Sequence, residues 1–579
     1  MPAAPERRIP GGRAAGVVVV SLVLAGLVPT AGRAHPSPEM TVRALSYAVV
    51  DGPRDDQRVT IDATLYVPAT ATPARPAPVV VLAHGFGGSK DDLAALARQT
   101  AHAGYVALAY SARGFAGSIG AIGLDSVDYD VKDVSQILDA LARMPEVLLD
   151  RPGDPRVGIT GRSYGGGIAL MAAASDPRVD AIAPRITWSS LVYALAPNNL
   201  LPFGDAPPGP LKLGWTTILF GRGVLERALG PPSPDGLLRL LPGAEGCAGF
   251  VPGVCQAYLG SVAAGLPTAG TVAILQRSSP DRLADRLDVP TFLVQGEADT
   301  LFNLIDSVRN LEALRSNGAP VKLLWHSGGH SGSLAPGEED QGLDPDGVID
   351  SRVLRWWDRW LRRDPEVETG PGFELALGEE DGRPRYVSAP RYPAFPDTTL
   401  YLSGDGVLVG DASRARAGSP TFANPPLGLP AALSEMPGVQ RFVGLPALEL
   451  PGQHVGWETE PFPRGVTVVG VPRLRLPLSS DTGEAWFFAK LYDVAPDGGA
   501  ELIGRQVSPV RATDLSAPLD IALPGTAHRL EPGHRLGVVL ASTDLAYANR
   551  RVPDRYTVTV DPTDPPRLEV PLRADPPAG

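Results

Sequence analysis

The stretch Arg156-Val-Gly-Ile-Thr-Gly-Arg-Ser-Tyr-Gly-Gly-Gly-Ile-Ala-Leu170 decides how this chain folds. It opens with a short apolar run, residues 157–160, which is typical of a buried parallel strand, and the alanine-rich run 168–174 predicts a helix. Between them lies a Gly-x-Ser-x-Gly motif centred on Ser163. Both glycines are needed, because side chains at 161 or 165 would collide with the neighbouring strand and helix. The stretch therefore predicts a nucleophile elbow that exposes the Ser163 hydroxyl.

Strands and helices alternate on both sides of this elbow. Amphipathic helical patterns follow the apolar strand runs at 78–83, 106–110, 289–295 and 321–325. This spacing is typical of a parallel sheet whose loops at the strand carboxyl ends carry function. Proline- and glycine-rich sequence interrupts the alternation at about 185–285, where we expect a cap over the active site. The fold class predicted here is α/β, an α/β-hydrolase with a helical cap insertion.

Beyond residue 369 the pattern changes to short alternating segments bounded by glycine and proline. Such segments are typical of an all-β sandwich. We therefore expect a catalytic domain over residues 35–369 and a β-sandwich domain over residues 370–579.

The N-terminal residues 1–34 have the layout of a secretory signal. Arg7, Arg8 and Arg13 precede an apolar run over 16–28, and small residues follow it at 31–34. The apolar run is short for a membrane span. We expect a secreted protein that begins near His35, although an uncleaved anchor stays an alternative.

Composition excludes one class of partner. The 579 residues carry 52 basic and 64 acidic side chains, a net charge of −12, and no lysine-rich or arginine-rich run, so we expect no nucleic-acid partner. The chain has two cysteines, Cys247 and Cys255, which in an oxidising compartment predict a local disulfide. No histidine lies near them, and we expect neither a metal nor a cofactor.

A serine nucleophile needs a base and an acid, which in this fold follow in the order Ser, Asp, His. His330, in the flexible Ser327-Gly-Gly-His-Ser-Gly332 loop, is the predicted base, and His326 at the preceding strand end is its competitor. Asp299, in Gly296-Glu-Ala-Asp299, is the predicted acid, because it follows a strand and precedes a helix. Glu297 and Asp306 compete for this role.

The oxyanion hole needs two backbone N–H donors. Tyr164, directly after the nucleophile, supplies one. Phe86, in the His84-Gly-Phe-Gly-Gly88 loop after the early strand, is the candidate for the second, with Gly87 as the neighbour that can replace it. His84 precedes the serine, and we expect it to be structural.

These features together resemble one family. The signal, Gly161-Arg-Ser-Tyr-Gly-Gly166, the cap, Gly-Glu-Ala-Asp299, Gly-Gly-His330 and the C-terminal sandwich are similar to the Xaa-Pro dipeptidyl-peptidase and cocaine-esterase-like hydrolases. These hydrolases also include α-amino-acid ester hydrolases and cephalosporin acylases. The resemblance implies a jelly-roll C-terminal domain, a Ser163–Asp299–His330 triad and Tyr164 N–H as an oxyanion donor. The sequence Arg113-Gly114 with Ser118 also matches the family's Arg-Gly loop.

Two positions depart from the family pattern. Well-known members complete the oxyanion hole with a tyrosine hydroxyl from the loop after the early strand, whereas this chain has Phe86 there. Ser111 stands ahead of Arg113 where an aspartate is common. The resemblance alone therefore leaves the second oxyanion donor open.

The predicted function is hydrolysis of an amide or ester bond through an acyl-enzyme, first as an Xaa-Pro dipeptidyl-peptidase and alternatively as a carboxylesterase or acylase. A dipeptidyl-peptidase must bind a free α-ammonium group, for which Asp205, Asp235 and Glu245 are candidates. A remoter alternative is a non-catalytic protein that binds a surface through the sandwich. That alternative needs exposed aromatic rows, whereas Trp486, Phe487 and Phe488 alternate as core residues do.

Overall fold

A long mixed sheet carries the nucleophile elbow at its centre. The computed structural model describes residues 40–204, 206–229, 249–338, 342, 347–428, 432–434 and 448–575, all within one compact unit, Met40–Gly579. The sheet runs in the order β1 (Thr41–Asp51), β2 (Gln57–Val67), β4 (Val106–Tyr110), β3 (Val79–Ala83), β7 (Val157–Arg162), β8 (Val179–Arg185), β9 (Thr291–Gly296), β10 (Val321–His326), β11 (Phe373–Glu380) and β12 (Arg383–Ala389). From β4 to β11 in this order, neighbouring strands are parallel. The strands at both edges pair antiparallel with their neighbours.

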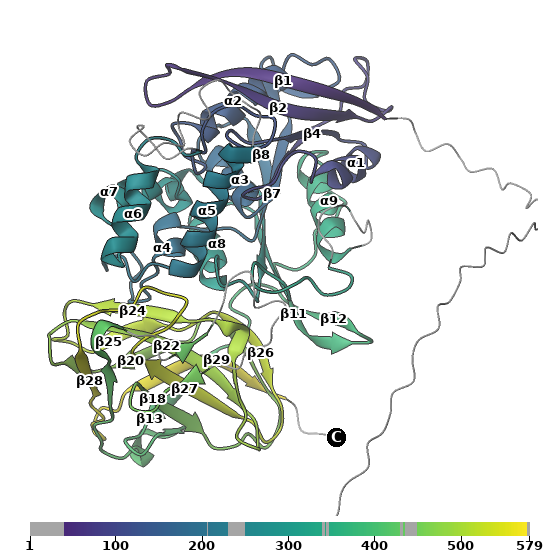
Figure 1. Cartoon of the computed structure of the whole chain (residues 1–579). Coiled ribbons are helices and arrows are strands. Elements are labelled where there is room, and N and C mark those ends of the chain that lie inside the picture. The colour runs from purple at the N-terminus through teal and green to yellow at the C-terminus, as the bar shows by residue number, and fades with distance from the viewer. Residues whose placement is uncertain are drawn as a thin grey trace, which may run out of the picture. The chain divides into compact units, whose positions relative to one another are not determined.

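Helices cover both faces of this sheet (Figure 1). Successive residues of a strand point to opposite faces, and in β3 Val80 and Leu82 pack into a core with α1 (Ala94–His102) and α9 (Val348–Trp360). Val79 and Val81 pack into the core of the other face. That face is covered by α2 (Asp130–Leu141), α3 (Tyr164–Ala173) and α8 (Leu304–Ser316). The small β5 (Leu149–Arg151) and β6 (Asp154–Pro155) hairpin leads into β7.

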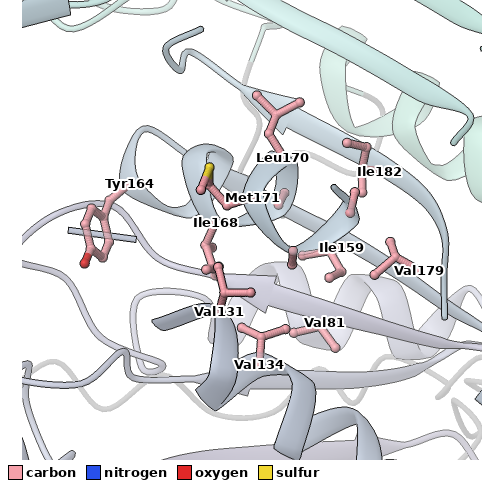
Figure 2. Packing of buried hydrophobic residues seen from close by; sticks show 14 of the residues in the cluster. Val81, Val131, Val134, Ile159, Tyr164, Ile168, Leu170, Met171, Val179 and Ile182 are labelled. Atoms are coloured by element: carbon pink, nitrogen blue, oxygen red, sulfur yellow. The ribbon is translucent and has the colours of Figure 1, made fainter. Parts of the chain in front are cut away.

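The helix after the nucleophile is anchored by apolar packing. Ile168 and Leu170 of α3 are buried against the central strands, where Ile159 and Ile182 are also fully buried (Figure 2). Helix α2 completes this packing through Val131 and Val134. The rigid packing of α3 fixes the position of the turn that precedes it.

The expected cap is present between β8 and β9. It contains α4 (Leu191–Leu195), α5 (Leu213–Leu229), α6 (Val254–Ala264), α7 (Ala269–Gln276) and the 3₁₀ helix η2 (Pro280–Arg286). The predicted α/β-hydrolase fold with a helical cap is confirmed.

The boundary expected at residues 369 and 370 is wrong by one hairpin. β11 and β12 belong to the first sheet, since β11 pairs in parallel with β10 through Leu323 opposite Phe373 and Trp325 opposite Leu375. Strands of the sandwich have the same short alternating pattern as β11 and β12. Only the pairing with neighbouring strands shows to which sheet such a strand belongs. The first sheet therefore continues to Ala389.

The remaining strands form the C-terminal sandwich, and its apolar core is separate from that of the first sheet. These strands are β13 (Asp397–Leu402), β14 (Val407–Val409), β15 (Thr421–Asn424), β16 (Ala432–Leu433), β17 (Leu448–Glu449), β18 (His454–Thr459), β19 (Val466–Gly470), β20 (Arg473–Leu476), β21 (Leu478–Ser480), β22 (Ala485–Val494), β23 (Ala500–Leu502), β24 (Ser508–Ala512), β25 (Leu519–Ala522), β26 (Thr526–Leu530), β27 (Arg535–Ala541), β28 (Asp554–Val558) and β29 (Arg567–Ala574). Trp486, Phe487 and Phe488 of β22 are all buried. They supply no aromatic binding row.

A buried ion pair joins the Arg-Gly loop to the edge of the first sheet. Arg113 Nη1 lies 2.6 Å from Asp51 Oδ2, and their side chains are 1% and 0% exposed. Arg113 Nε donates to the Ala121 carbonyl at 2.8 Å, and the guanidinium carbon lies 4.8 Å from the ring centroid of Tyr129. Asp133 is also buried, with a carboxylate oxygen 3.8 Å from the guanidinium.

Replacing Arg113 by methionine is expected to lower the free energy of unfolding by about 3–5 kcal/mol, because the buried Asp51 carboxylate loses its cation. Urea unfolding followed by tryptophan fluorescence measures this loss. The matched control is Arg54→Met, whose side chain is 84% exposed beside Asp56 and for which a change within about 0.5 kcal/mol is expected. Equal losses in the two variants would contradict a structural role for the buried pair.

Candidate active site

The elbow places Ser163 in a strained turn at the end of β7. Its backbone has φ 56° and ψ −116°, in the left-handed half of conformational space that non-glycine residues rarely adopt. A Cβ atom on Gly161 or on Gly165 would overlap the carbonyl oxygen of Ala83 in β3. Glycine at both positions therefore lets the turn approach the neighbouring strand and expose the serine hydroxyl.

The three residues predicted as a triad lie in direct contact. His330 Nε2 is 2.8 Å from Ser163 Oγ, and His330 Nδ1 is 2.6 Å from Asp299 Oδ2. The imidazole also packs edge-on against Trp215 and Phe302, with ring centroids 5.9 and 5.1 Å away. This is the geometry by which a carboxylate orients a base toward a serine nucleophile.

Asp299 is fully buried, and backbone amides hold its carboxylate in place. Asp299 Oδ1 accepts hydrogen bonds from the amides of Leu301 at 3.1 Å and Phe302 at 2.8 Å. The other oxygen is directed at His330. The amides of the loop after β9 therefore bind one carboxylate oxygen of Asp299, and the other oxygen is left to bind the imidazole of His330.

The two competing acids have other environments. Burial, followed by the nearby Glu338, raises the pKa of Glu297 well above its ordinary value. Asp306 is buried on α8 and accepts from the Ser189 amide at 2.9 Å, and burial raises its pKa to about 7. The hydrogen bond of His330 Nδ1 is made to Asp299 and not to either of them.

The other two histidines near the strand ends are structural. His326 is fully buried, accepts from the Gly328 amide at 3.1 Å through Nδ1, and has its pKa lowered to about 3, mainly by burial. His84 Nδ1 donates to the Gly85 carbonyl at 2.7 Å, while Nε2 accepts from the Ala112 amide at 2.9 Å. Burial lowers the pKa of His84, and the neutral ring joins two loops.

The predicted oxyanion donors flank Ser163. Tyr164 begins α3, and a Cβ atom on Gly85 would lie 3.8 Å from Ser163 Cβ, so the loop that carries Phe86 lies against the nucleophile. Within the described part of the chain, no acceptor is bonded to the amide of Tyr164 or Phe86. The Tyr164 hydroxyl is bonded to Asp130 Oδ1 at 3.1 Å and to the Asp125 amide at 3.0 Å. The assignment of both amides stays a prediction.

An apolar cavity of about 120 Å³ opens beside Ser163. Its walls come from the cap and from the loops of the first sheet and include Phe86, Trp188, Phe220, Phe250 and Phe302. Phe220 stacks on Phe250 and on Tyr258, with centroid distances of 5.5 and 3.9 Å. No charged side chain lines this cavity among the residues that the structure describes.

The few hydroxyl groups in the cavity wall are already engaged. Thr216 Oγ1 donates to the Lys212 carbonyl at 2.8 Å, and Ser261 Oγ donates to the Ala257 carbonyl at 2.7 Å. Thr271 Oγ1 also contacts the Ala257 carbonyl, at 3.1 Å. Apart from the nucleophile, the cavity therefore presents an apolar surface.

Two residues outside the first sheet, which the sequence did not predict, bind the loop after β9 that carries Asp299. Lys212 of the cap, which is buried, donates through Nζ to the carbonyls of Thr300 at 2.8 Å and Leu301 at 2.7 Å. Gln506 of the sandwich donates through Nε2 to the Asp299 carbonyl at 2.8 Å. Neither residue lies near a recognisable motif, so only the three-dimensional structure identifies them.

Several sequence expectations fall outside the described residues. They are the signal over 1–34, the ammonium-binding candidates Asp205, Asp235 and Glu245, and Cys247. Pairing of Cys247 with Cys255 therefore stays a prediction. Within the described ranges, no helix has the length and apolar character to cross a bilayer.

Two protein-family models match the chain. The model of the X-Pro dipeptidyl-peptidase (S15 family) matches residues 55–214, and that of the X-Pro dipeptidyl-peptidase C-terminal non-catalytic domain matches residues 387–570. The first match contains Ser163 and Tyr164, and the second begins at the end of β12 and continues through the sandwich. No curated protein sequence matches the chain.

Solved structures share the whole architecture. An α-amino acid ester hydrolase superimposes with a TM-score of 0.64 at 18% identity, over 94% of this chain and 98% of that one. An aminopeptidase from a marine sediment Thaumarchaeota archaeon gives 0.62 at 17% identity, over 92% and 96%. A CocE/NonD family hydrolase from Staphylococcus aureus gives 0.61 at 13% identity, over 94% and 99%. At these identities the likeness is one of fold.

Asp299→Asn is expected to lower kcat by at least about 10³-fold, because an amide stabilises the wrong tautomer of His330. Glu297→Gln is the matched control, with an expected loss of less than about threefold. Burial and the nearby Glu338 raise the pKa of Glu297, which favours its neutral form, and the His330 imidazole is bonded to Asp299 instead. Steady-state kinetics on one nitrophenyl ester measure both. A larger loss for Glu297→Gln would show that the acid is misassigned.

Proposed function

The chain belongs to the X-Pro dipeptidyl-peptidase and cocaine-esterase-like family of serine hydrolases, and we propose that it hydrolyses carboxylic esters with an apolar acyl group. The observation that carries this proposal is the apolar cavity of about 120 Å³ beside Ser163. Ser163, His330 and Asp299 form the proposed catalytic machinery.

The reaction follows from the bonded geometry. Ser163 Oγ attacks the ester carbonyl while His330 Nε2, 2.8 Å away, takes the hydroxyl proton. The tetrahedral oxyanion is proposed to accept hydrogen bonds from the amides of Tyr164 and Phe86. His330 then gives its proton to the leaving alcohol, which departs as the carbon–oxygen ester bond breaks and leaves an acyl-Ser163. Water, deprotonated by His330, repeats the attack and releases the acid.

The cavity supports an apolar acyl group rather than a charged one. A buried ammonium group needs a carboxylate or several acceptors to replace its lost hydration. Among the described lining residues there is no carboxylate, and three wall hydroxyls already donate to helix carbonyls. Each methylene group placed in such a cavity gains about 0.8 kcal/mol.

The second candidate is an Xaa-Pro dipeptidyl-peptidase, which the names of both matching family models favour. It requires a carboxylate within reach of the substrate's amino terminus. Asp205, Asp235 and Glu245 are the sequence's candidates for that carboxylate. A direct comparison of substrates distinguishes the two functions.

For p-nitrophenyl esters, kcat/KM is expected to rise about fourfold per methylene from acetate to butyrate, since each buried CH₂ contributes about 0.8 kcal/mol. Ala-Pro-p-nitroanilide is expected to react far more slowly, and Ser163→Ala is expected to abolish turnover of both. Serine-dependent cleavage of the anilide with a strict need for a free amino terminus would instead assign the peptidase.

Variants of α6 connect the chain-length preference to the cavity. Ala257 lines the cavity, so Ala257→Leu is expected to lower kcat/KM for the hexanoate ester at least about tenfold and for the acetate ester less than about threefold. Ala263→Leu on the exposed side of the same helix is the matched control. Equal effects of the two substitutions would show that the cavity does not determine the chain-length preference.

Export of the enzyme is the second part of the proposal, supported by the signal layout of residues 1–34. After expression of the full chain in a bacterial host with a secretion system, the exported protein is expected to begin near His35. Mass spectrometry of its N-terminal peptide tests this. An enzyme that keeps Arg7 and Arg8 at its terminus would instead support an uncleaved anchor.

A further inference from the structure

A buried carboxylate organises the loop that carries His330. Glu338 follows that loop in sequence, and its side chain is fully buried. We propose that Glu338 is a positioning residue, which holds His330 at hydrogen-bond distance from Ser163 by tying the two ends of the His330 loop together. The inference rests on the proposed Ser163–His330–Asp299 machinery and adds a residue that acts on it through the loop backbone.

Four donors surround the carboxylate. Glu338 Oε1 accepts from the Ser327 amide at 3.2 Å and from the Tyr386 hydroxyl at 2.6 Å. Glu338 Oε2 accepts from the Ala335 amide at 3.1 Å and from the Ser327 hydroxyl. Because the two backbone amides can only donate, the site favours a side chain with two acceptor oxygens, which the Glu338 carboxyl group supplies.

The positions of these donors explain the effect on His330. Ser327 lies three residues before the imidazole and Ala335 five residues after it, so both ends of the loop are bonded to one side chain. Between them, the Ser331 amide donates to the Ala298 carbonyl at 3.1 Å, beside the acid Asp299. The clamp at the loop ends therefore orients the imidazole between Ser163 and Asp299.

The third partner comes from the edge of the sheet. Tyr386 belongs to β12, in the hairpin that extends the first sheet. The guanidinium of Arg352 lies 5.3 Å from the Tyr386 ring centroid, and Arg352 is itself paired with Glu374 at 2.8 Å. The hairpin thus supplies a fixed donor to the clamp.

Glu297 is a second glutamate close to Glu338. Burial and the nearby Glu338 raise its pKa well above the ordinary value, which favours the neutral form of Glu297. The four hydrogen bonds of the clamp are all made to Glu338.

The test replaces one acceptor oxygen by a donor without changing shape. In Glu338→Gln the amide NH₂ group faces a backbone N–H donor, of Ser327 or of Ala335, whichever way the side chain is turned. We expect kcat on the butyrate ester, and the rate at which a fluorophosphonate labels Ser163, to fall at least tenfold. KM is expected to stay within threefold, because Glu338 does not line the acyl cavity.

Two further variants keep the result interpretable. Tyr386→Phe removes one of the four donors and is expected to lower kcat two- to fivefold with KM unchanged. Glu368→Gln alters an exposed glutamate and is expected to match the wild type. Thermal unfolding of all three variants shows whether the fold is retained, and if Glu338→Gln does not fold, Tyr386→Phe decides.

Wild-type kcat in folded Glu338→Gln, or in Tyr386→Phe where only that variant folds, would overturn the proposal. A rise in KM with unchanged kcat would overturn it too, since the loop would then act on substrate binding. Failure of the wild-type enzyme itself to react with the fluorophosphonate is a different result. That result would contradict the proposed catalytic function of Ser163 itself.

Discussion

The contact between the nucleophile elbow and β3 is the constraint on which the site depends. Gly161 and Gly165 both approach the carbonyl oxygen of Ala83 more closely than any side chain allows. That approach forces Ser163 into a backbone conformation with φ 56° and directs its hydroxyl outward. The strain is tolerated because α3 behind the turn is fully buried and cannot relax. The position of Ser163 is therefore set by the central strands, and the rest of the site is arranged around a fixed nucleophile.

The sequence predicted those parts of the structure whose signals are local. The elbow is a motif of five residues flanked by a strand and a helix, and Asp299 and His330 follow strands at places that the fold reserves for the acid and the base. The β11–β12 hairpin was assigned wrongly because a short alternating strand has the same pattern in either sheet. Glu338, Lys212 and Gln506 were not predicted, because a buried polar side chain is identified by its partners. For Gln506, the partner carbonyl belongs to Asp299, 207 residues earlier in the chain.

These unpredicted contacts explain why the site needs the whole chain. The loop that carries Asp299 accepts hydrogen bonds from Lys212 of the cap and Gln506 of the sandwich. Glu338 binds both ends of the loop that carries His330 and is itself bonded to Tyr386 at the sheet edge. A hydrogen bond to a buried carbonyl is costly to lose, because the carbonyl then has no water to replace the donor. The sandwich therefore contributes to the geometry of the acid, although its aromatic residues in β22 are buried.

The ionisable groups around the site support the same conclusion as the apolar cavity, namely that the site suits an apolar acyl group. Burial lowers the pKa of His84 and of His326, and burial with the nearby Glu338 raises the pKa of Glu297, so these three groups favour their neutral forms. An ammonium group brought into this environment would find aromatic rings and engaged hydroxyls. An apolar acyl chain would displace water at no electrostatic cost and would gain from each methylene buried. The physical chemistry of the described walls thus favours an esterase, and a peptidase would have to obtain its carboxylate from a part of the cap beyond those walls.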